Sequence, residues 1–85
     1  MPAPAILTLL TRPDCHLCAD ARAVIDVVVG DFPGVQVVER SILDDAELLE
    51  RYVDEIPVVL INERVHTIWR VDPARLRTAL EEATR

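Results

Sequence analysis

Apolar and polar positions alternate along the first half of the chain in a way that predicts three elements. Residues 5–10 form a short apolar run, which is typical of a strand buried on both faces. Apolar residues then recur at helical spacing and predict an amphipathic helix over residues 15–30, which Gly30 is placed to end. Residues 32–34 favour a turn and residues 35–40 a second strand. The first half is therefore predicted to form a strand, a helix and a strand.

The pattern of the second half predicts a shorter helix and a pair of strands. Two acidic residues open a helix over residues 44–52, where the helix macrodipole favours negative charge. A buried strand follows over residues 58–61. Residues 62–64 have the composition of a hairpin connection, and residues 65–71 form the returning strand. The hairpin implies that these two strands are antiparallel.

A closing helix begins at Asp72, because an acidic N-cap followed by Pro73 is a strong helix start. Its apolar stripe consists of Leu76, Ala79, Leu80 and Ala83. The predicted order is β-α-β-α-β-β-α. A β-α-β unit requires a right-handed parallel crossover, whereas the hairpin is antiparallel. We therefore predict a single α/β domain over residues 1–85, in which helices cover a four-stranded mixed sheet.

Composition and charge exclude several classes of protein. The chain has 85 residues, of which 51% are hydrophobic, so one folded domain is expected and intrinsic disorder is not. A net charge of −6 argues against nucleic-acid and anionic-membrane partners. No apolar run approaches the roughly 18–20 residues of a membrane span. The first four residues lack the basic region of a secretory signal. We therefore expect a cytoplasmic protein, and a monomer.

Two cysteines carry the chemistry, at the point where the first strand ends and the first helix begins. Cys15 and Cys18 are three residues apart, which places them on one helix face within disulfide reach. At the helix N-terminus, unpaired N–H groups and the macrodipole stabilise a Cys15 thiolate. Cys18 lies one turn inside and is more shielded, so the pair suits an attacking and a resolving thiol. Arg12 favours the thiolate, whereas the carboxylate of Asp14 disfavours it.

Other interpretations of a C-x-x-C motif remain open at this point. The motif is also found as half of a zinc site or as two structural core thiols. A second C-x-x-C is expected for zinc and is absent from the sequence. We therefore expect no metal ligands, and a redox pair is favoured over buried structural thiols.

Three segments resemble one known family. Thr-Arg-Pro-Asp-Cys-His-Leu-Cys at residues 11–18, Glu-Ile-Pro-Val-Val at 55–59 and Val-Asp-Pro at 71–73 are similar to the small glutaredoxin-like proteins of the thioredoxin fold. The resemblance extends over residues 6–80. It implies that Cys15 is the nucleophile, that Cys18 is the resolving thiol, and a sheet order of 2-1-3-4. It also implies that Pro57 is a cis-proline facing the cysteines.

The chain departs from the family pattern at three places. His16-Leu17 stands where glutaredoxins usually have Pro-Tyr and thioredoxins Gly-Pro, and Glu55 replaces the threonine of Thr-Val-Pro. Residues 68–70 occupy the stretch of the Gly-Gly segment that helps glutaredoxins hold glutathione. We expect no cofactor beyond the redox-active disulfide. Glutathione, another low-molecular-weight thiol and a thioredoxin-reductase-type enzyme are the candidate reductants.

Five further residues are candidates for substrate binding. Arg12 is either an anion contact for a substrate carboxylate or a solvated loop charge, and a protonated His16 would favour the nucleophilic thiolate if it is not simply solvated. Pro57 lacks an N–H group, which leaves the Ile56 main chain available to a passing peptide. Asp72 places a carboxylate beside the position where glutathione's own carboxylate binds in glutaredoxins.

His66 and Trp69, in the second strand of the hairpin, are predicted to have structural and not functional roles. We expect His66 on the surface or at the edge of the sheet, and not as a ligand. Trp69 alternates with Val65 and Val71, which favours packing in the core or on a sheet face.

The sequence therefore predicts a thiol–disulfide oxidoreductase that acts on a disulfide-containing protein or a small-molecule thiol. Two alternatives are a homodimeric module in which Cys15 from each subunit bridges an iron–sulfur cluster, and a thioredoxin-fold adaptor without redox activity.

Overall fold

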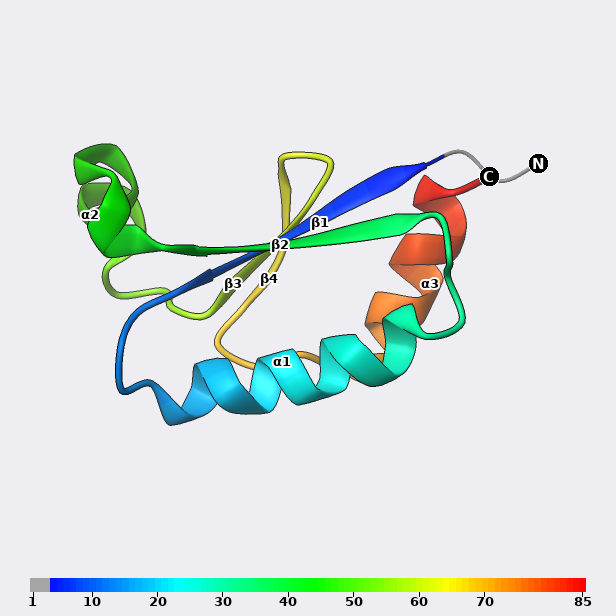
Figure 1. Cartoon of the computed structure of the whole chain (residues 1–85), viewed down its shortest axis with the longest axis horizontal. Helices are drawn as coiled ribbons and strands as arrows, with labels where there is room; N and C mark the ends of the chain where they lie inside the picture. The colour runs from blue at the N-terminus through cyan, green and yellow to red at the C-terminus, as the bar shows by residue number, and fades with distance from the viewer. Residues whose placement is uncertain (1–3) are drawn as a thin grey trace.

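The computed structural model describes residues 4–85, and its elements follow the predicted order (Figure 1). Within that range the strands are β1 (Ala5–Thr11), β2 (Val35–Ser41), β3 (Val58–Ile61) and β4 (Arg64–Ile68). The helices are α1 (His16–Val29), α2 (Ala46–Tyr52) and α3 (Pro73–Ala83), and a 3₁₀ turn spans Ile42–Asp44. Residues 1–3 belong to the segment expected to lack a secretory signal, and they lie outside the described residues.

The four strands form one mixed sheet in the order β2-β1-β3-β4, which confirms the expected topology. β1 runs parallel to β2, with Ala5 opposite Val35, and antiparallel to β3, with Leu7 opposite Ile61. β3 and β4 form the antiparallel hairpin. Because β1 and β2 are parallel, α1 must carry the chain back along the sheet between them. The segment that leaves the carboxyl end of β1 therefore leads directly into the start of α1.

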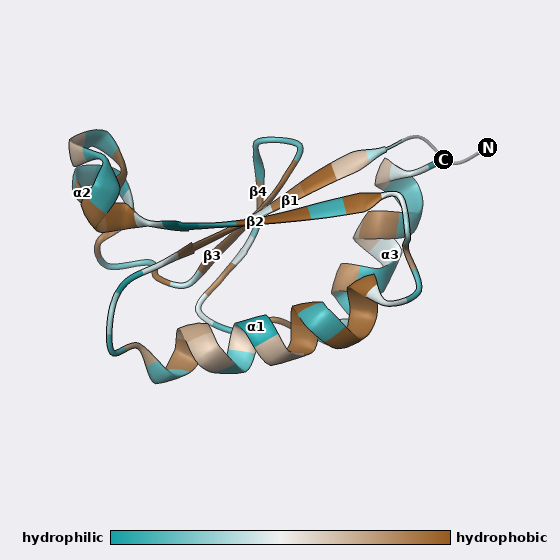
Figure 2. Cartoon of the chain, viewed as in Figure 1, coloured by the Kyte–Doolittle hydropathy of each residue, from teal (hydrophilic) through white to brown (hydrophobic). Residues whose placement is uncertain are grey.

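One face of the sheet is covered by α1 and α3, and most of the core lies between them and the strands (Figures 1 and 2). Leu7 and Leu9 point to this face and are fully buried, as are Ile25 of α1 and Leu80 of α3. Each such side chain contributes roughly 1.5–3 kcal/mol through its burial. We call the buried residues of this face the main cluster: Ala5, Leu7, Leu9, Ala21, Ile25, Val28, Val35, Val59, Ile61, Leu76 and Leu80.

The opposite face is covered only at one end, where the short helix α2 lies (Figure 1). Leu10 and Val58 are buried there, but Ile6, near the far end of β1, is 48% exposed. The expectation that the first strand is buried on both faces is therefore wrong for this end, because α2 has only seven residues. A second group of buried residues gathers at this end of the sheet and includes Cys18 of α1. We call it the site cluster: Leu10, Cys18, Ile42, Tyr52, Ile56 and Val58.

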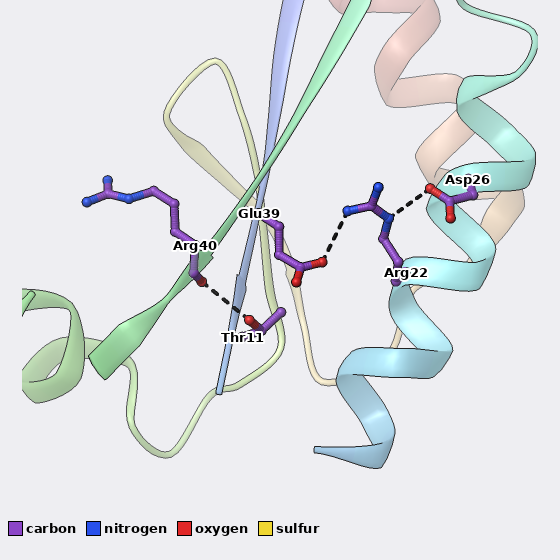
Figure 3. A network of polar contacts seen from close by, with 5 residues as sticks. All are labelled: Thr11, Arg22, Asp26, Glu39 and Arg40. Atoms are coloured by element: carbon purple, nitrogen blue, oxygen red, sulfur yellow. Dashed lines mark hydrogen bonds and ion pairs between the residues drawn. The ribbon is translucent and has the colours of Figure 1, made fainter. Parts of the chain in front are cut away.

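An exposed polar network fixes α1 beside β2 (Figure 3). Arg22 of α1 donates to Asp26 at 2.9 Å and to Glu39 of β2 at 3.1 Å. The Thr11 hydroxyl donates to the Arg40 carbonyl at 3.5 Å, between the ends of β1 and β2. Exposed ion pairs of this kind contribute about 0–1 kcal/mol each, so the network orients α1 more than it stabilises the fold.

The strand predicted over residues 65–71 is shorter than expected, and this prediction is wrong at its carboxyl end. β4 ends at Ile68 because Trp69 has a φ of 66°, which no strand accommodates. The Arg70 N–H donates to the Ile68 carbonyl at 2.8 Å and closes a tight turn around Trp69. Trp69 is 53% exposed, so the prediction that it packs in the core or on a sheet face is also wrong.

The helix ends follow the capping signals of the sequence closely. The Asp45 and Asp72 carboxylates accept hydrogen bonds from the N–H groups of Glu47 and Ala74 and begin α2 and α3. α1 ends at Gly30 as predicted, although Gly30 has a right-handed φ of −54°. None of the helices within residues 4–85 combines the length and the apolar character of a membrane span.

The turn between β3 and β4 also depends on positive φ angles. Asn62 and Glu63 have φ values of 50° and 69°, the pattern of a tight hairpin turn that requires φ above zero at both central positions. The Asn62 side chain accepts a hydrogen bond from the Ile6 N–H at 2.9 Å. Asparagine suits this conformation, whereas glutamate does not. The hairpin therefore holds one strained residue.

Candidate functional site

Cys15 lies at the N-cap of α1, as the sequence predicts. The loop formed by residues 12–14 separates it from β1, and Asp14 in that loop adopts a φ of 57°, which turns the chain toward the helix. Cys15 itself has an extended backbone, with φ −112° and ψ 108°. Its sulfur occupies the position of a capping oxygen and accepts a hydrogen bond from the Cys18 N–H at 3.2 Å. A first-turn N–H group of α1 thus points at the Cys15 Sγ.

The two cysteines form a disulfide across the first turn of α1. Their Cα atoms are 5.2 Å apart, within the usual range for a bridge. Cys18 is only 6% exposed and belongs to the site cluster, whereas Cys15 is partly buried and packs against the edge of that cluster. Cys15 is therefore the more accessible of the two sulfurs, in line with the unequal shielding that the spacing predicts.

The segment before β3 packs against the cysteine pair from a distant part of the sequence. Ile56 is buried in the site cluster together with Cys18. The Ile56–Pro57 peptide bond is cis, and the Pro57 side chain is fully buried. Among residues 4–85, neither the N–H nor the carbonyl of Ile56 has a hydrogen-bond partner. An unpaired backbone edge therefore lies beside the disulfide.

The remaining predicted binding residues lie on three separate segments. Arg12 lies exposed in the loop before Cys15, and His16 is the exposed first residue of α1. Asp72 caps α3, and its carboxylate accepts from the Ala74 N–H at 2.9 Å. Within residues 4–85, no hydrogen bond or ion pair joins Arg12, His16 or Asp72 to a cysteine. Of the predicted site residues, Cys15, Cys18 and Ile56 pack together in or against the site cluster.

In the part of the chain that the structure describes, no group of three or more His, Cys, Asp or Glu side chains is arranged to hold a metal ion.

Trp69 is a candidate site residue that the sequence reasoning missed. Its backbone N–H donates to the Pro57 carbonyl at 2.8 Å, and its indole Nε1–H donates to the Asp54 carbonyl at 3.1 Å. Both bonds tie Trp69 to the segment that carries Ile56. The available signal was the replacement of a Gly-Gly segment by residues that include the single tryptophan of the chain.

His66 lies on the edge strand β4, where the sequence places it, and faces α3. Its Nε2 atom is buried and has no hydrogen-bond partner within residues 4–85. Burial lowers the pKa of His66, and the nearby positive charge of Arg75 lowers it further. The fold therefore favours the neutral form of the imidazole.

Comparisons with known proteins agree with this architecture. The sequence model of the glutaredoxin-like domain family (DUF836) matches residues 6–81. An uncharacterized protein of Mycobacterium tuberculosis is 32% identical over 80 residues, which cover 89% of this chain and 82% of that protein. The X-ray structure of the protein XcR50 from X. campestris aligns with a TM-score of 0.73 at 32% identity, covering 91% of this chain and 97% of that one.

A more distant comparison concerns the fold alone. Thioredoxin from Fasciola hepatica aligns with a TM-score of 0.70 at 13% identity, covering 96% of this chain and 83% of that chain. The sheet order and the helix positions are therefore those of the thioredoxin fold. With this fold and a family match over residues 6–81, the chain belongs to the glutaredoxin-like (DUF836) family.

Proposed function

We propose that this protein is a thiol–disulfide oxidoreductase that exchanges electrons through Cys15 and Cys18. The observation that carries the proposal is the Cys15–Cys18 disulfide at the N-terminus of α1, with the Cys18 N–H directed at the Cys15 sulfur. A donor at this position stabilises negative charge on that sulfur, both while it is a thiolate and when it is the leaving group. The unequal burial of the two sulfurs supports unequal roles.

The reaction consists of two exchange steps. In the reduced protein, the Cys15 thiolate attacks one sulfur of the substrate disulfide, and the other substrate sulfur leaves as a thiolate that takes up a proton. Cys18 then loses its proton and attacks the Cys15 sulfur of the mixed disulfide. The second substrate thiolate leaves, and the Cys15–Cys18 bond forms. Two electrons have passed to the substrate, and an external thiol or dithiol must return them.

The unpaired backbone of Ile56 supports a role in holding the substrate. An extended peptide aligned with this edge would form main-chain hydrogen bonds beside the disulfide. Pro57 has no N–H of its own, so it does not compete for the acceptor groups of such a peptide. Arg12 and His16, which are exposed on either side of Cys15 in the sequence, are proposed as flanking contacts.

We propose that glutathione is a poor reductant for this pair. Pro73 at the start of α3 has no N–H, and the next N–H, that of Ala74, is already bound to the Asp72 carboxylate. Few donors are thus left there for the glutathione carboxylate. Asp72 and Glu55 also add like charge, which disfavours binding by on the order of 1 kcal/mol at a surface. A thioredoxin-reductase-type enzyme or another low-molecular-weight thiol is proposed in its place.

A redox titration combined with two variants tests the proposal. We expect the wild-type protein to cycle between dithiol and disulfide in dithiothreitol buffers. Cys18→Ser should accumulate a mixed disulfide on Cys15 when mixed with a disulfide substrate, as mass spectrometry would show, whereas Cys15→Ser should react slowly. Adducts that form equally fast on Cys18 of the Cys15→Ser protein would reverse the roles. A pair that never reduces a substrate disulfide would overturn the function.

A matched comparison separates the reductants. Disulfide reduction is measured with glutathione and glutathione reductase, and then with thioredoxin reductase, at equal protein concentration. We expect the first rate to be the lower one. A glutathione-dependent rate as high as that of an ordinary glutaredoxin, lost in Arg12→Ala, would contradict the proposed reductant.

A further inference from the structure

Trp69 is held in a conformation that burial does not explain. The residue is 53% exposed, yet it adopts a φ of 66°, which is unfavourable for a bulky side chain. Three hydrogen bonds maintain it, from its own N–H to Pro57, from its indole to Asp54, and across it from Arg70 to Ile68. Strained residues that the surrounding structure fixes in this way occur preferentially at ligand-binding sites.

The ring of Trp69 borders a groove that lies against the first two turns of α1. The groove has a volume of about 230 Å³, below the roughly 300–1,000 Å³ of typical small-molecule sites. The groove is lined by five apolar residues and two charged ones: Leu17, Asp20, Ala21 and Val24 of α1, and Trp69, Arg70 and Val71 on the other side. Trp69 connects the groove to the segment beside the disulfide, because its backbone N–H binds the carbonyl of Pro57, the residue after Ile56. Its volume suits a single side chain, and its apolar lining residues outnumber the charged pair, Asp20 and Arg70.

The charges around the groove and the disulfide are unbalanced. The adjoining segments carry exposed or partly exposed acidic and basic residues, namely Asp14, Asp20, Asp54, Glu55 and Asp72 against Arg12 and Arg70. In addition, the whole chain has a net charge of −6. Such a surface repels anionic partners and attracts basic ones. Glutathione, with two carboxylates and one ammonium group, is anionic, so the acidic excess around the groove disfavours it.

We propose that Trp69 and this groove recognise an apolar side chain next to the reacting cysteine of a polypeptide substrate with a basic flanking sequence. This inference rests on the proposed oxidoreductase function and specifies its substrate class. The peptide backbone pairs with Ile56, its cysteine faces Cys15, and its apolar neighbour enters the groove beside Trp69. Trp69 thus determines specificity and does not take part in the exchange itself.

Synthetic peptides test the proposal. Each peptide carries one cysteine in a mixed disulfide with 2-mercaptoethanol, with either Phe or Ser beside it and either basic or acidic flanks. The rate of reduction by the reduced protein is followed by acid quenching and mass spectrometry. We expect the basic Phe peptide to react at least about tenfold faster than the basic Ser peptide, because the Phe side chain fills the groove and the Ser side chain leaves it empty. We also expect the acidic peptides to react more slowly, an effect that about 1 M salt removes.

The key variant is Trp69→Gly, because glycine accepts a φ of 66° and the variant loses the indole without backbone strain. We expect its Phe-to-Ser preference to fall close to one. Val27→Ala is the matched control, since Val27 is an exposed apolar residue of α1 outside the groove and is 73% exposed. The control should keep the full preference. Equal rates for both peptides with wild-type protein, or an unchanged preference in Trp69→Gly, would overturn the proposal.

A binding measurement keeps this test independent of the exchange reaction. In a Cys15→Ser, Cys18→Ser double variant, the emission of Trp69, the only tryptophan in the sequence, reports the peptide in the groove. The Phe peptide should shift the emission at a lower concentration than the Ser peptide. If the wild-type protein reduces no disulfide at all, the oxidoreductase function fails. The emission measurement then tests peptide recognition by the groove independently. If both peptides shift the emission at the same concentration, that recognition is refuted.

Discussion

Reduction of the Cys15–Cys18 disulfide should release two thiols of very different reactivity. Cys15 caps α1, is partly exposed, and its sulfur accepts the Cys18 N–H at 3.2 Å. Cys18 is 6% exposed within an apolar cluster. In the reduced protein we therefore expect the pKa of the Cys15 thiol to lie below that of Cys18. The helix terminus stabilises a thiolate on Cys15, and burial disfavours one on Cys18.

The size of the difference follows from the same geometry. A helix N-terminus stabilises a negative charge by about 0.3–2 kcal/mol. Since about 1.4 kcal/mol is a factor of ten, this is roughly a two- to thirtyfold gain in thiolate at neutral pH. Burial of Cys18 acts in the same direction. The carboxylate of Asp14 disfavours the Cys15 thiolate, but Asp14 is exposed and solvent screens its charge. We expect Cys15 to react about tenfold faster than Cys18.

Alkylation measures this ratio directly. The reduced protein is treated with iodoacetamide at several pH values, and the modified cysteine is identified by peptide mapping. In urea the two thiols should react at nearly the same rate, because the chain is unfolded and α1 no longer stabilises a thiolate on Cys15. The ratio should therefore appear only in the folded protein. Equal alkylation of the folded protein, or faster modification of Cys18, would refute the assignment of Cys15 as the attacking thiol.

Three further predictions concern stability. Ile25→Ala should lower the free energy of unfolding by about 2–5 kcal/mol in urea denaturation, because Ile25 is fully buried in the main cluster. Exposed Val27→Ala should change it little. Glu63→Gly should raise the free energy of unfolding by about 1 kcal/mol in the same assay, since it removes a side chain from a φ of 69°; a decrease would contradict the turn geometry. His66 should make stability fall as the pH drops below 6.5, because its lowered pKa lets the unfolded chain bind more protons than the folded one in that range. This dependence of stability on pH should be absent in His66→Gln, which leaves the neighbouring Arg75 and Glu82 of α3 unchanged. If the dependence persists in that variant, groups other than His66 cause it.

The elements that could be predicted most accurately are those with strong local signals. The strand Val58–Ile61 has the bounds expected from its apolar run. Asp72 begins α3 through the capping bond that its residue type favours. The cysteine pair is likewise a local feature, because the end of a strand and the start of a helix determine the position of Cys15.

The elements predicted less well depend on contacts between distant segments. The alternation of Val65, Trp69 and Val71 favours a strand, but hydrogen bonds from Trp69 to Pro57 and Asp54 accompany a turn instead. The exposure of Ile6 depends on the length of α2, which no residue near Ile6 indicates. In the site, the packing of Ile56 against Cys18 joins segments 38 positions apart in sequence, so local patterns alone gave no reason to expect it. Only the family resemblance brought that segment to the cysteines.

The division of the apolar interior into two clusters has a consequence for how sequences in this family can diverge. The main cluster shares no buried residue with the site cluster around Cys18, so substitutions there act first on stability. Substitutions in the site cluster alter the surroundings of the cysteines as well and are subject to two constraints. α2 covers only the end of the sheet near the cysteines, and Ile6 at the other end stays open. Homologues can therefore gain residues over that open face, and with them new surfaces, without a change in the exchange chemistry.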